Sequence, residues 1–259
     1  MSLFVSLFAI LKLSLYLLTT LIIVPLQLVY SYLTGDFIRV AILYHKACLF
    51  IFGIKVRIHG TLPLSEQTII LSNHLSYLDI TVLGSFASAV FVSKDDVAKW
   101  PLFGFLASLQ KTVFISRSRA GLEKAKNDIQ ERLQQNQNLI LFPEGTSTRG
   151  ISVYPFKSSL LSVLEKASPP PLIQPIAIKH NKLNGRPVKT NQDRDAYAWH
   201  IDDDLEIHQH LWIMAKQRSF VIDVYILDPI EGAKISDRKV LAKLAEEKIR
   251  NSVEAHQTS

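Results

Sequence analysis

The sequence predicts an α/β fold: a mixed central sheet flanked by helices, with an N-terminal helical segment that associates with a membrane. Over residues 55–259, short apolar runs typical of buried strands alternate with amphipathic stretches of helical period. Before them, residues 13–35 carry no charge, and about 20 apolar residues are enough to cross a bilayer. We therefore expect membrane-anchoring helices over residues 1–54 and an α/β domain over residues 55–259.

The membrane-associated segment is expected to contain more than one helical stretch. Pro25 lies in the middle of the apolar run and predicts a kink or a break into two shorter helices. Residues 37–54 are apolar with Arg39, His45 and Lys46 interspersed, which is typical of a helix at a membrane surface whose basic groups face the lipid headgroups. The sequence leaves open whether this segment spans the bilayer or lies in its interface.

The remaining elements alternate as an α/β sheet requires. Strands are expected at residues 55–60, 67–72, 89–94, 111–116, 138–146, 172–178 and 219–227, of which the fifth runs on into a loop and the sixth is broken by Pro175. Helices are expected at residues 76–88, 120–136, 158–167 and 236–251. Sites in such sheets lie in crevices at strand ends, so the polar residues that follow the strands are the functional candidates.

Composition narrows the class of partner. The net charge of +6 favours anionic partners such as phosphate substrates or acidic lipid surfaces. No nucleic-acid partner is expected, because the sequence has no zinc-finger, RNA-recognition or helix-turn-helix pattern. The single Cys48 excludes a disulfide framework and is expected to be a buried hydrophobic residue. His200, His208 and His210 lie beside three aspartates, yet we expect a solvated loop there and no bound metal.

The stretch NHLSYLD at residues 73–79 is the first candidate for chemistry. In one continuous helix, residues five apart point about 140° away from each other, so His74 and Asp79 meet only if the chain bends. A strand that ends at Ser72, followed by a turn and a helix from about Ser76, would let Asp79 reach one ring nitrogen of His74. The carboxylate would then fix the tautomer and leave the other nitrogen as a base. On spacing alone, a surface histidine near a helix-opening aspartate is the commoner reading.

The stretch LFPEGTSTRG at residues 141–150 is the second candidate. Its glycine and hydroxyl residues permit a tight loop whose backbone amides can bind anionic oxygens. Further charges follow other strands or open a helix, and the alternative for each is ordinary solvated charge. The residues that we expect to bind substrate are Asn73, Lys94, Arg117, Glu144, Gly145, Thr146, Arg149 and Lys157. The run WPLFGFL after Lys94 offers an apolar surface for an acyl chain, or plain core.

Four segments together carry a resemblance. NHLSYLD contains His-X4-Asp, and FISR, FPEGT and IQPIAI follow it in order within residues 55–180. The sequence resembles the 1-acylglycerol-3-phosphate acyltransferase family, which also has a hydrophobic N-terminal segment. The resemblance implies that His74 is the general base and Asp79 its partner. It also implies that Arg117, Glu144, Gly145 and Thr146 hold the polar end of the acceptor.

One departure bears on the acceptor. Many members of the family have an arginine directly after Phe-Pro-Glu-Gly-Thr, whereas this chain has Ser147 there and Arg149 two residues later. This motif, the following PFKSSLL and the stretch at residues 196–212 look more like a bacterial branch that includes lyso-ornithine-lipid acyltransferases.

The expected function is that of a membrane-bound O-acyltransferase. It would move a fatty acyl group from acyl-CoA or an acyl-carrier protein to a lysolipid hydroxyl, with 1-acylglycerol-3-phosphate as first candidate acceptor and phosphatidic acid as product. Lyso-ornithine lipid or another lysophospholipid is the alternative acceptor, and a non-catalytic lipid-binding protein is the alternative class. No cofactor besides the thioester co-substrate is expected, and transfer is direct unless Ser72 or Ser76 acts as a nucleophile. The expected location is a bacterial inner membrane, with the catalytic domain facing the cytoplasm.

Overall fold

The centre of the molecule is a mixed sheet, as predicted. The computed structural model describes residues 3–63, 67–116, 118–164, 170–200, 205–231 and 237–255. Its strands are β1 Ile54–His59, β2 Thr68–Ser72, β3 Ala89–Lys94, β4 Val113–Ile115, β5 Asn138–Leu141, β6 Leu172–Leu183, β7 Arg186–Pro187, β8 Phe220–Ile226 and β9 Ile230–Glu231. They form one sheet in the order β1-β8-β6-β2-β5-β3-β4, with β7 and β9 paired to β6. The run from β6 to β4 is parallel, whereas β8 is antiparallel to β6.

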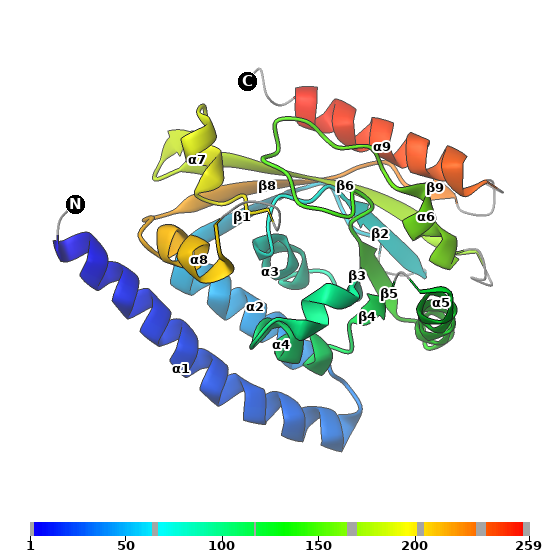
Figure 1. Ribbon diagram of the computed structural model, residues 1–259, viewed down its shortest axis with the longest axis horizontal. Helices are drawn as coiled ribbons and strands as arrows, with labels where there is room; N and C mark the ends of the chain where they lie inside the picture. Colours follow the sequence, from blue (N-terminus) through cyan, green and yellow to red (C-terminus); the bar gives the residue numbers. More distant parts are fainter. Residues whose placement is uncertain are drawn as a thin grey trace.

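Helices cover both faces of this sheet (Figure 1). They are α1 Leu3–Thr34, α2 Arg39–Phe52, α3 Leu78–Gly84, α4 Phe103–Leu109, α5 Arg119–Gln134, α6 Ser158–Leu161, α7 Asn191–Asp195, α8 Ile207–Ala215 and α9 Arg238–Ala255, with 3-10 turns η1 Asp95–Lys99 and η2 Ser162–Leu164. Ile69 and Leu71 enter the hydrophobic cluster under α5 and α9, and Ile70 enters the cluster under α2, α3 and α8. β2 is therefore buried along its whole length.

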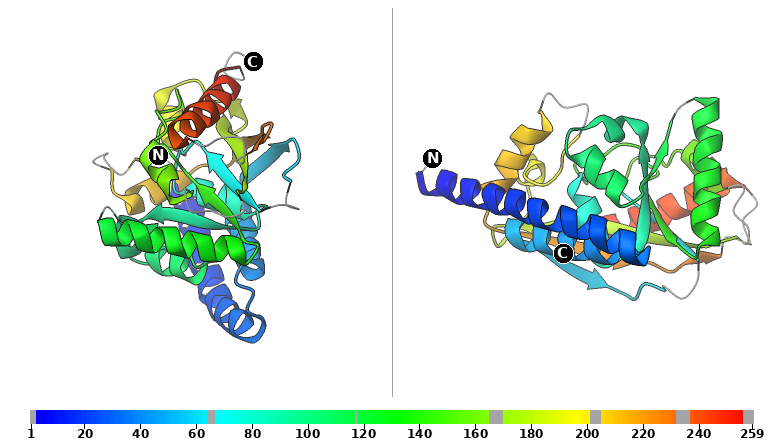
Figure 2. Two further views of the ribbon diagram at one scale, coloured as in Figure 1. Left: turned by 90° about the vertical axis from the view of Figure 1, so that its right-hand side faces the viewer. Right: turned by 90° about the horizontal axis from the view of Figure 1, so that it is seen from below.

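The polarity of α1 is the reverse of that of a helix on a water-soluble protein. Its polar residues face the protein, where Lys12 Nζ donates to the Phe52 carbonyl at 3.2 Å and Gln27 Nε2 donates to the Phe37 carbonyl at 2.7 Å. Its outward face exposes large apolar side chains, among them Leu3, Phe4, Leu7, Leu11, Leu18, Leu21, Ile22 and Leu33. The N-terminal end of α1 projects beyond the rest of the molecule (Figure 2). By length and composition, it is the one helix among the described residues that could cross a membrane.

Two prolines lie inside elements that they were expected to interrupt. Of the kink or break predicted at Pro25, the break is wrong, because α1 continues through Pro25 as one helix, and the kink stays a prediction. The break predicted at Pro175 is also wrong. On one side, Pro175 pairs with Leu71 of β2. On the other side, Ile176 pairs with β8 and Ile173 pairs with β9, so the partner strand changes at Pro175. The missing N–H of Pro175 thus falls at a gap in the ladder, so β6 passes through without losing a bond.

Two histidines are more deeply placed than expected. Arg39 and Lys46 of α2 are exposed, but His45 is buried, with its Nε2 at 3.0 Å from Gln110 Oε1. His210 is buried within α8, so a solvated loop is the wrong prediction for it. The aspartates beside it, Asp202, Asp203 and Asp204, lie outside the described residues, as do Ser236 and residues 165–167 of two expected helices. Cys48 is buried, as predicted.

Candidate active site

The predicted bend at residues 73–79 is present. β2 ends at Ser72, and α3 begins at Leu78. Between them, the Asn73 side chain accepts from the Ile178 backbone N–H at 2.7 Å and donates to the Ile178 carbonyl at 2.9 Å. These bonds tie the end of β2 to β6, because they extend the sheet ladder through a side chain. His74 follows at the edge of the sheet, and Asp79 lies in the first turn of α3.

His74 and Asp79 meet across this bend. His74 Nδ1 lies 2.8 Å from Asp79 Oδ2, and Asp79 is completely buried. The same carboxylate oxygen accepts from the backbone N–H groups of Leu75 at 2.6 Å and Ser76 at 2.9 Å. A buried carboxylate that accepts several hydrogen bonds cannot turn away from the ring without losing them. Asp79 therefore holds the tautomer in which Nδ1 carries the proton, and Nε2 is left as the basic nitrogen.

The ring of His74 is also fixed by stacking and remains accessible. It lies on the Phe142 ring with centroids 4.1 Å apart and an interplanar angle of 18°, and its side chain is 19% exposed. Its backbone N–H donates to Glu144 Oε1 at 2.7 Å, and its carbonyl accepts from the Thr148 N–H at 2.8 Å. The loop after β5 thus fixes the histidine through three contacts, from Phe142, Glu144 and Thr148.

Glu144 joins loops within the site. It is 1% exposed, and its second oxygen accepts from the Tyr154 backbone N–H at 2.8 Å. Burial raises the pKa of Glu144 to about 8, against the opposing effect of the two backbone donors. Both carboxylate oxygens are engaged with backbone, so the geometry assigns Glu144 the task of joining the His74 turn to the loop that contains Tyr154.

The loop after Glu144 brings Gly145 close to Lys157. Gly145 has φ +65°, and the position of a Cβ there lies 3.3 Å from Lys157 Nζ, so Lys157 lies against this glycine. The backbone N–H groups of Thr146 and Ser147 have no hydrogen-bond partner among the described residues. Amide groups of this kind beside an amine are suited to hold an anionic oxygen.

The other predicted binding residues are placed differently. Arg149 Nε lies 2.6 Å from Asp195 Oδ1 at the surface, and Lys94 ends β3 beside the apolar cavity described below. The side chain of Asn73 holds β6, as described above. Arg117 lies outside the described residues. Substrate binding by these four residues stays a prediction.

Sequence reasoning quoted the segments that contain Tyr197, Phe142 and Ser147 but assigned none of the three a role in the site. The Tyr197 hydroxyl donates to Asp79 Oδ1 at 2.9 Å, from 118 residues further along the chain. The Ser147 hydroxyl donates to the Trp199 carbonyl. Phe142 could have been identified, because it precedes Pro-Glu-Gly-Thr directly, but nothing in the sequence points from Tyr197 to Asp79.

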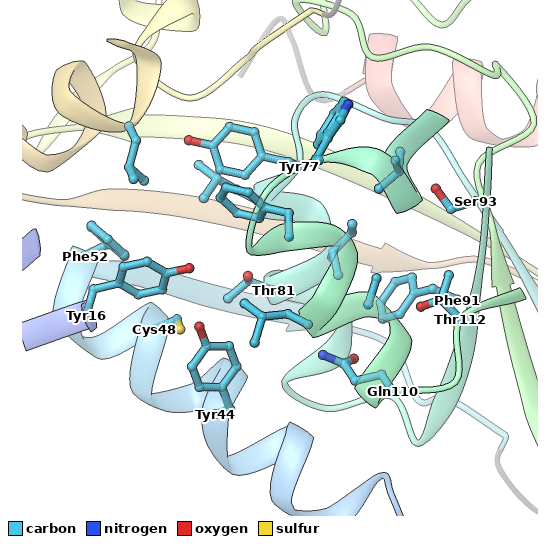
Figure 3. Close-up of a pocket in the computed structure, with 18 of the residues that line it drawn as sticks. Tyr16, Tyr44, Cys48, Phe52, Tyr77, Thr81, Phe91, Ser93, Gln110 and Thr112 are labelled. Carbon is cyan, nitrogen blue, oxygen red and sulfur yellow. The ribbon is translucent and has the colours of Figure 1, made fainter. Parts of the chain in front are cut away.

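An apolar cavity lies beside the dyad. It is lined by α1, α2, α3 and the segment 91–112, with Tyr16 and Phe52 at one end and Phe91, Gln110 and Thr112 at the other (Figure 3). Phe91 stacks on Phe142 with centroids 6.5 Å apart, and Phe142 stacks on His74, so the cavity wall is two rings from the dyad. Tyr77, next to the bend, also lines the cavity.

The two serines that flank His74 are poorly placed as nucleophiles. Both Ser72 and Ser76 are completely buried. The Ser72 hydroxyl donates to the Asn73 carbonyl at 3.0 Å, whereas the Ser76 hydroxyl has no hydrogen-bond partner among the described residues. Neither hydroxyl bonds to His74, which a serine nucleophile would need for activation.

Comparisons with known proteins agree with this geometry. A family described as Acyltransferase matches residues 53–179. The lyso-ornithine lipid O-acyltransferase of Rhizobium meliloti is 32% identical over 213 residues, which cover 80% of this chain and 72% of that protein. The 1-acyl-sn-glycerol-3-phosphate acyltransferase of Neisseria gonorrhoeae is 28% identical over 183 residues, which cover 70% of this chain and 68% of that protein.

A solved structure shares the fold over nearly the whole chain. The crystal structure of the 1-acyl-sn-glycerophosphate (LPA) acyltransferase from Thermotoga maritima aligns with a TM-score of 0.68 at 21% identity, covering 99% of this chain and 96% of that chain. This likeness includes the N-terminal helices, because it extends beyond the part matched by the family. The matched family motifs and the relatives of 30% identity or more show that the chain belongs to the acyltransferase family.

Proposed function

We propose that this protein is a membrane-bound lysolipid O-acyltransferase. The observation that carries the proposal is the bond between His74 Nδ1 and the buried Asp79, which leaves His74 Nε2 as a base. Two stacked rings, Phe142 and Phe91, connect His74 to the apolar cavity. A lipid-binding protein of no activity has no need of this dyad. The relatives named for lyso-ornithine lipid and those named for 1-acylglycerol-3-phosphate are all lysolipid acyltransferases, which is the same reaction class.

The reaction follows from the chemistry of the dyad. His74 Nε2 takes the proton of the acceptor hydroxyl while the hydroxyl oxygen attacks the thioester carbonyl carbon. The C–S bond then breaks, and the departing sulfur takes the proton back from the imidazolium, so the products are an ester and a free thiol. Asp79 stabilises the imidazolium that forms between these steps, and base assistance of this kind contributes ~10²–10⁴-fold. The backbone N–H groups of Thr146 and Ser147 are candidate donors to an anionic oxygen. The transfer uses no cofactor besides the thioester.

The cavity is the proposed site of an acyl chain. Its lining is almost wholly apolar, and it lies between the domain and the two N-terminal helices. The outward face of α1 exposes leucine and isoleucine while its polar groups bond inward, which is the arrangement that lipid favours. We therefore place α1 in the bilayer, so that a lipid tail can enter the cavity without crossing water. The proposed location is the bacterial inner membrane, with the domain on the cytoplasmic side where acyl thioesters are made.

We propose lyso-ornithine lipid as the preferred acceptor. Ser147 stands where many relatives of the phosphate-acceptor type have an arginine, and its hydroxyl is bonded to the Trp199 carbonyl. Arg149, the nearest arginine in sequence, is paired with Asp195. In the sequence comparisons, the lyso-ornithine lipid O-acyltransferase of Rhizobium meliloti matches 80% of this chain, against 70% for the 1-acyl-sn-glycerol-3-phosphate acyltransferase of Neisseria gonorrhoeae.

A second acceptor, 1-acylglycerol-3-phosphate, is favoured by one observation. Lys157 and the amides of Thr146 and Ser147, which have no partner in the described part of the chain, together suit a phosphate. A direct test separates the two. Purified protein in detergent micelles is given a radiolabelled long-chain acyl-CoA or acyl-carrier protein and either lysolipid. We expect kcat/KM to be at least tenfold higher with lyso-ornithine lipid. The reverse order would make the protein a 1-acylglycerol-3-phosphate acyltransferase, and binding of lipid with no ester product would make it a lipid-binding protein.

A further inference from the structure

Tyr197 connects a distant segment of the chain to the catalytic pair. It follows α7, outside the part of the chain that the family matches, and lies in the stretch at residues 196–212 that resembles the bacterial branch. Its hydroxyl donates to Asp79 Oδ1 at 2.9 Å, and both residues are completely buried. It is the only hydrogen-bond donor to this oxygen among the described residues, because His74, Leu75 and Ser76 all donate to Oδ2.

The segment that bears Tyr197 is bonded to both loops of the site. The next residue but one, Trp199, donates its backbone N–H to the Leu75 carbonyl at 3.0 Å and accepts from the Ser147 hydroxyl. The ring of Tyr197 packs on His180 and Phe220, with centroids 5.3 Å and 6.0 Å away. The hydroxyl is thereby held in place independently of any substrate.

We propose that Tyr197 is a positioning residue that sets the charge of Asp79 and, through it, the basicity of His74. The inference rests on the proposed function of the dyad. Four donors then share one buried carboxylate, three on Oδ2 and one on Oδ1. Each donor stabilises the negative charge of Asp79 and so weakens the attraction between that charge and a proton on His74. The donors therefore favour the state in which His74 is neutral and able to accept a proton. Without the Tyr197 hydroxyl, Oδ1 is a buried acceptor with no donor, and the pair binds a proton more tightly.

Other titratable groups face this pair and bear on the design of a test. Glu144 reaches it from the loop after β5, with a pKa that burial raises to about 8, so it titrates within the assay range in every variant. His180 of β6 contacts the Tyr197 ring, and burial lowers its pKa to about 4, so it stays neutral. Burial also raises the pKa of Tyr77, which precedes α3. A change that appears only on replacement of Tyr197 therefore belongs to the dyad.

The test is Tyr197→Phe, which removes one oxygen and keeps the ring packing. We expect kcat to fall by up to about tenfold at pH 6 with the KM values for donor and acceptor changed less than threefold. The acid limb of the pH profile should move up by about one pH unit, so that activity partly recovers above pH 8. Tyr225→Phe, which removes a hydroxyl on β8 away from the dyad, is the matched control and should behave as the parent protein.

A second readout does not depend on turnover. Histidine labelled with carbon-13 gives the apparent pKa of His74 by NMR titration, which should rise in Tyr197→Phe and stay unchanged in Tyr225→Phe. A loss of kcat that is equal at all pH values, or an unchanged NMR titration, would overturn the proposal in favour of a merely structural tyrosine. If the parent protein transfers no acyl group, the proposed function fails, while the NMR titration still decides whether Tyr197 sets the basicity of His74.

Discussion

Replacing Asp79 with asparagine isolates the contribution of one negative charge. The amide oxygen can keep the three hydrogen bonds of Oδ2, from His74 Nδ1 and the backbone N–H groups of Leu75 and Ser76, so the tautomer and the turn are preserved. The amide NH2 then faces the Tyr197 hydroxyl, whose oxygen can accept from it. What is lost is the stabilisation of the imidazolium that forms when His74 takes the acceptor proton.

The size of this loss can be bounded from the geometry. At the observed 2.8 Å separation of the two atoms, unit charges attract by about 6 kcal/mol at an effective dielectric constant of ~20. The net value of a hydrogen bond to a charged group is about 1.5–3 kcal/mol. These limits correspond to ~10-fold and ~10⁴-fold in rate, and we expect a fall in kcat of ~10²–10³-fold with KM unchanged.

The assay is the initial rate of acyl transfer at saturating thioester and lysolipid, with thermal unfolding of each variant as the check on folding. Because His74 and Asp79 act as one unit, the double variant His74→Gln with Asp79→Asn should be no slower than His74→Gln alone. An Asp79→Asn enzyme within threefold of the parent rate, or losses that multiply in the double variant, would refute the assignment of Asp79 as the partner of the base.

Three further predictions test other parts of the structure. Burial raises the pKa of Glu144 from 4.5 to about 8, so its proton stabilises the fold fully below pH 4.5, and this stabilisation, roughly 5 kcal/mol at most, is lost towards pH 8. Glu144→Gln should therefore flatten the fall in melting temperature between pH 5 and pH 8, and an equal fall in both proteins would contradict the burial effect. Gln110 lines both the large cavity and a smaller one beyond it, so Gln110→Ala should join the two and admit a longer acyl chain. We expect the preference for chains two carbons longer to rise by ~15-fold, at ~0.8 kcal/mol per CH2, and an unchanged chain-length profile would place the acyl chain elsewhere. Asn73→Ala should lower the free energy of unfolding by about 1–3 kcal/mol through the two lost bonds to Ile178 and leave KM unchanged, whereas a higher KM at unchanged stability would show that Asn73 binds substrate.

The strands were predictable because their burial is encoded locally. Ala89–Lys94 has the predicted bounds, and Ile69–Leu71 is an apolar run buried on both faces, as a central parallel strand must be. The error at Pro175 has a different origin. A proline interrupts a strand only where its N–H is needed by the ladder, and at Pro175 that depends on the change of partner strand from β8 to β9, which the local sequence does not contain.

The dyad was predictable in outline, and its surroundings were not. The spacing of His74 and Asp79 requires a bend if the two are to meet, and a bend was a local inference. Tyr197 and Ser147 make contacts between segments that are far apart in sequence, so no local pattern indicates these contacts, although both segments were singled out by their resemblance to the bacterial branch. His45 was misplaced because a histidine in an apolar helix was read as a surface group, whereas its ring packs against Gly84 and bonds to Gln110.

Acceptor-dependent acyl transfer by the parent protein and by His74→Gln is the most direct measurement of the proposed chemistry. Each purified protein is incubated with a radiolabelled acyl thioester, with and without lyso-ornithine lipid, and labelled ester and free thiol are counted together. We predict equal amounts of ester and thiol from the parent protein only when the acceptor is present, and a rate at least 10²-fold lower from a normally folded His74→Gln protein. Ester formation by His74→Gln at the parent rate, or label covalently retained on the protein, would contradict direct transfer by a histidine base.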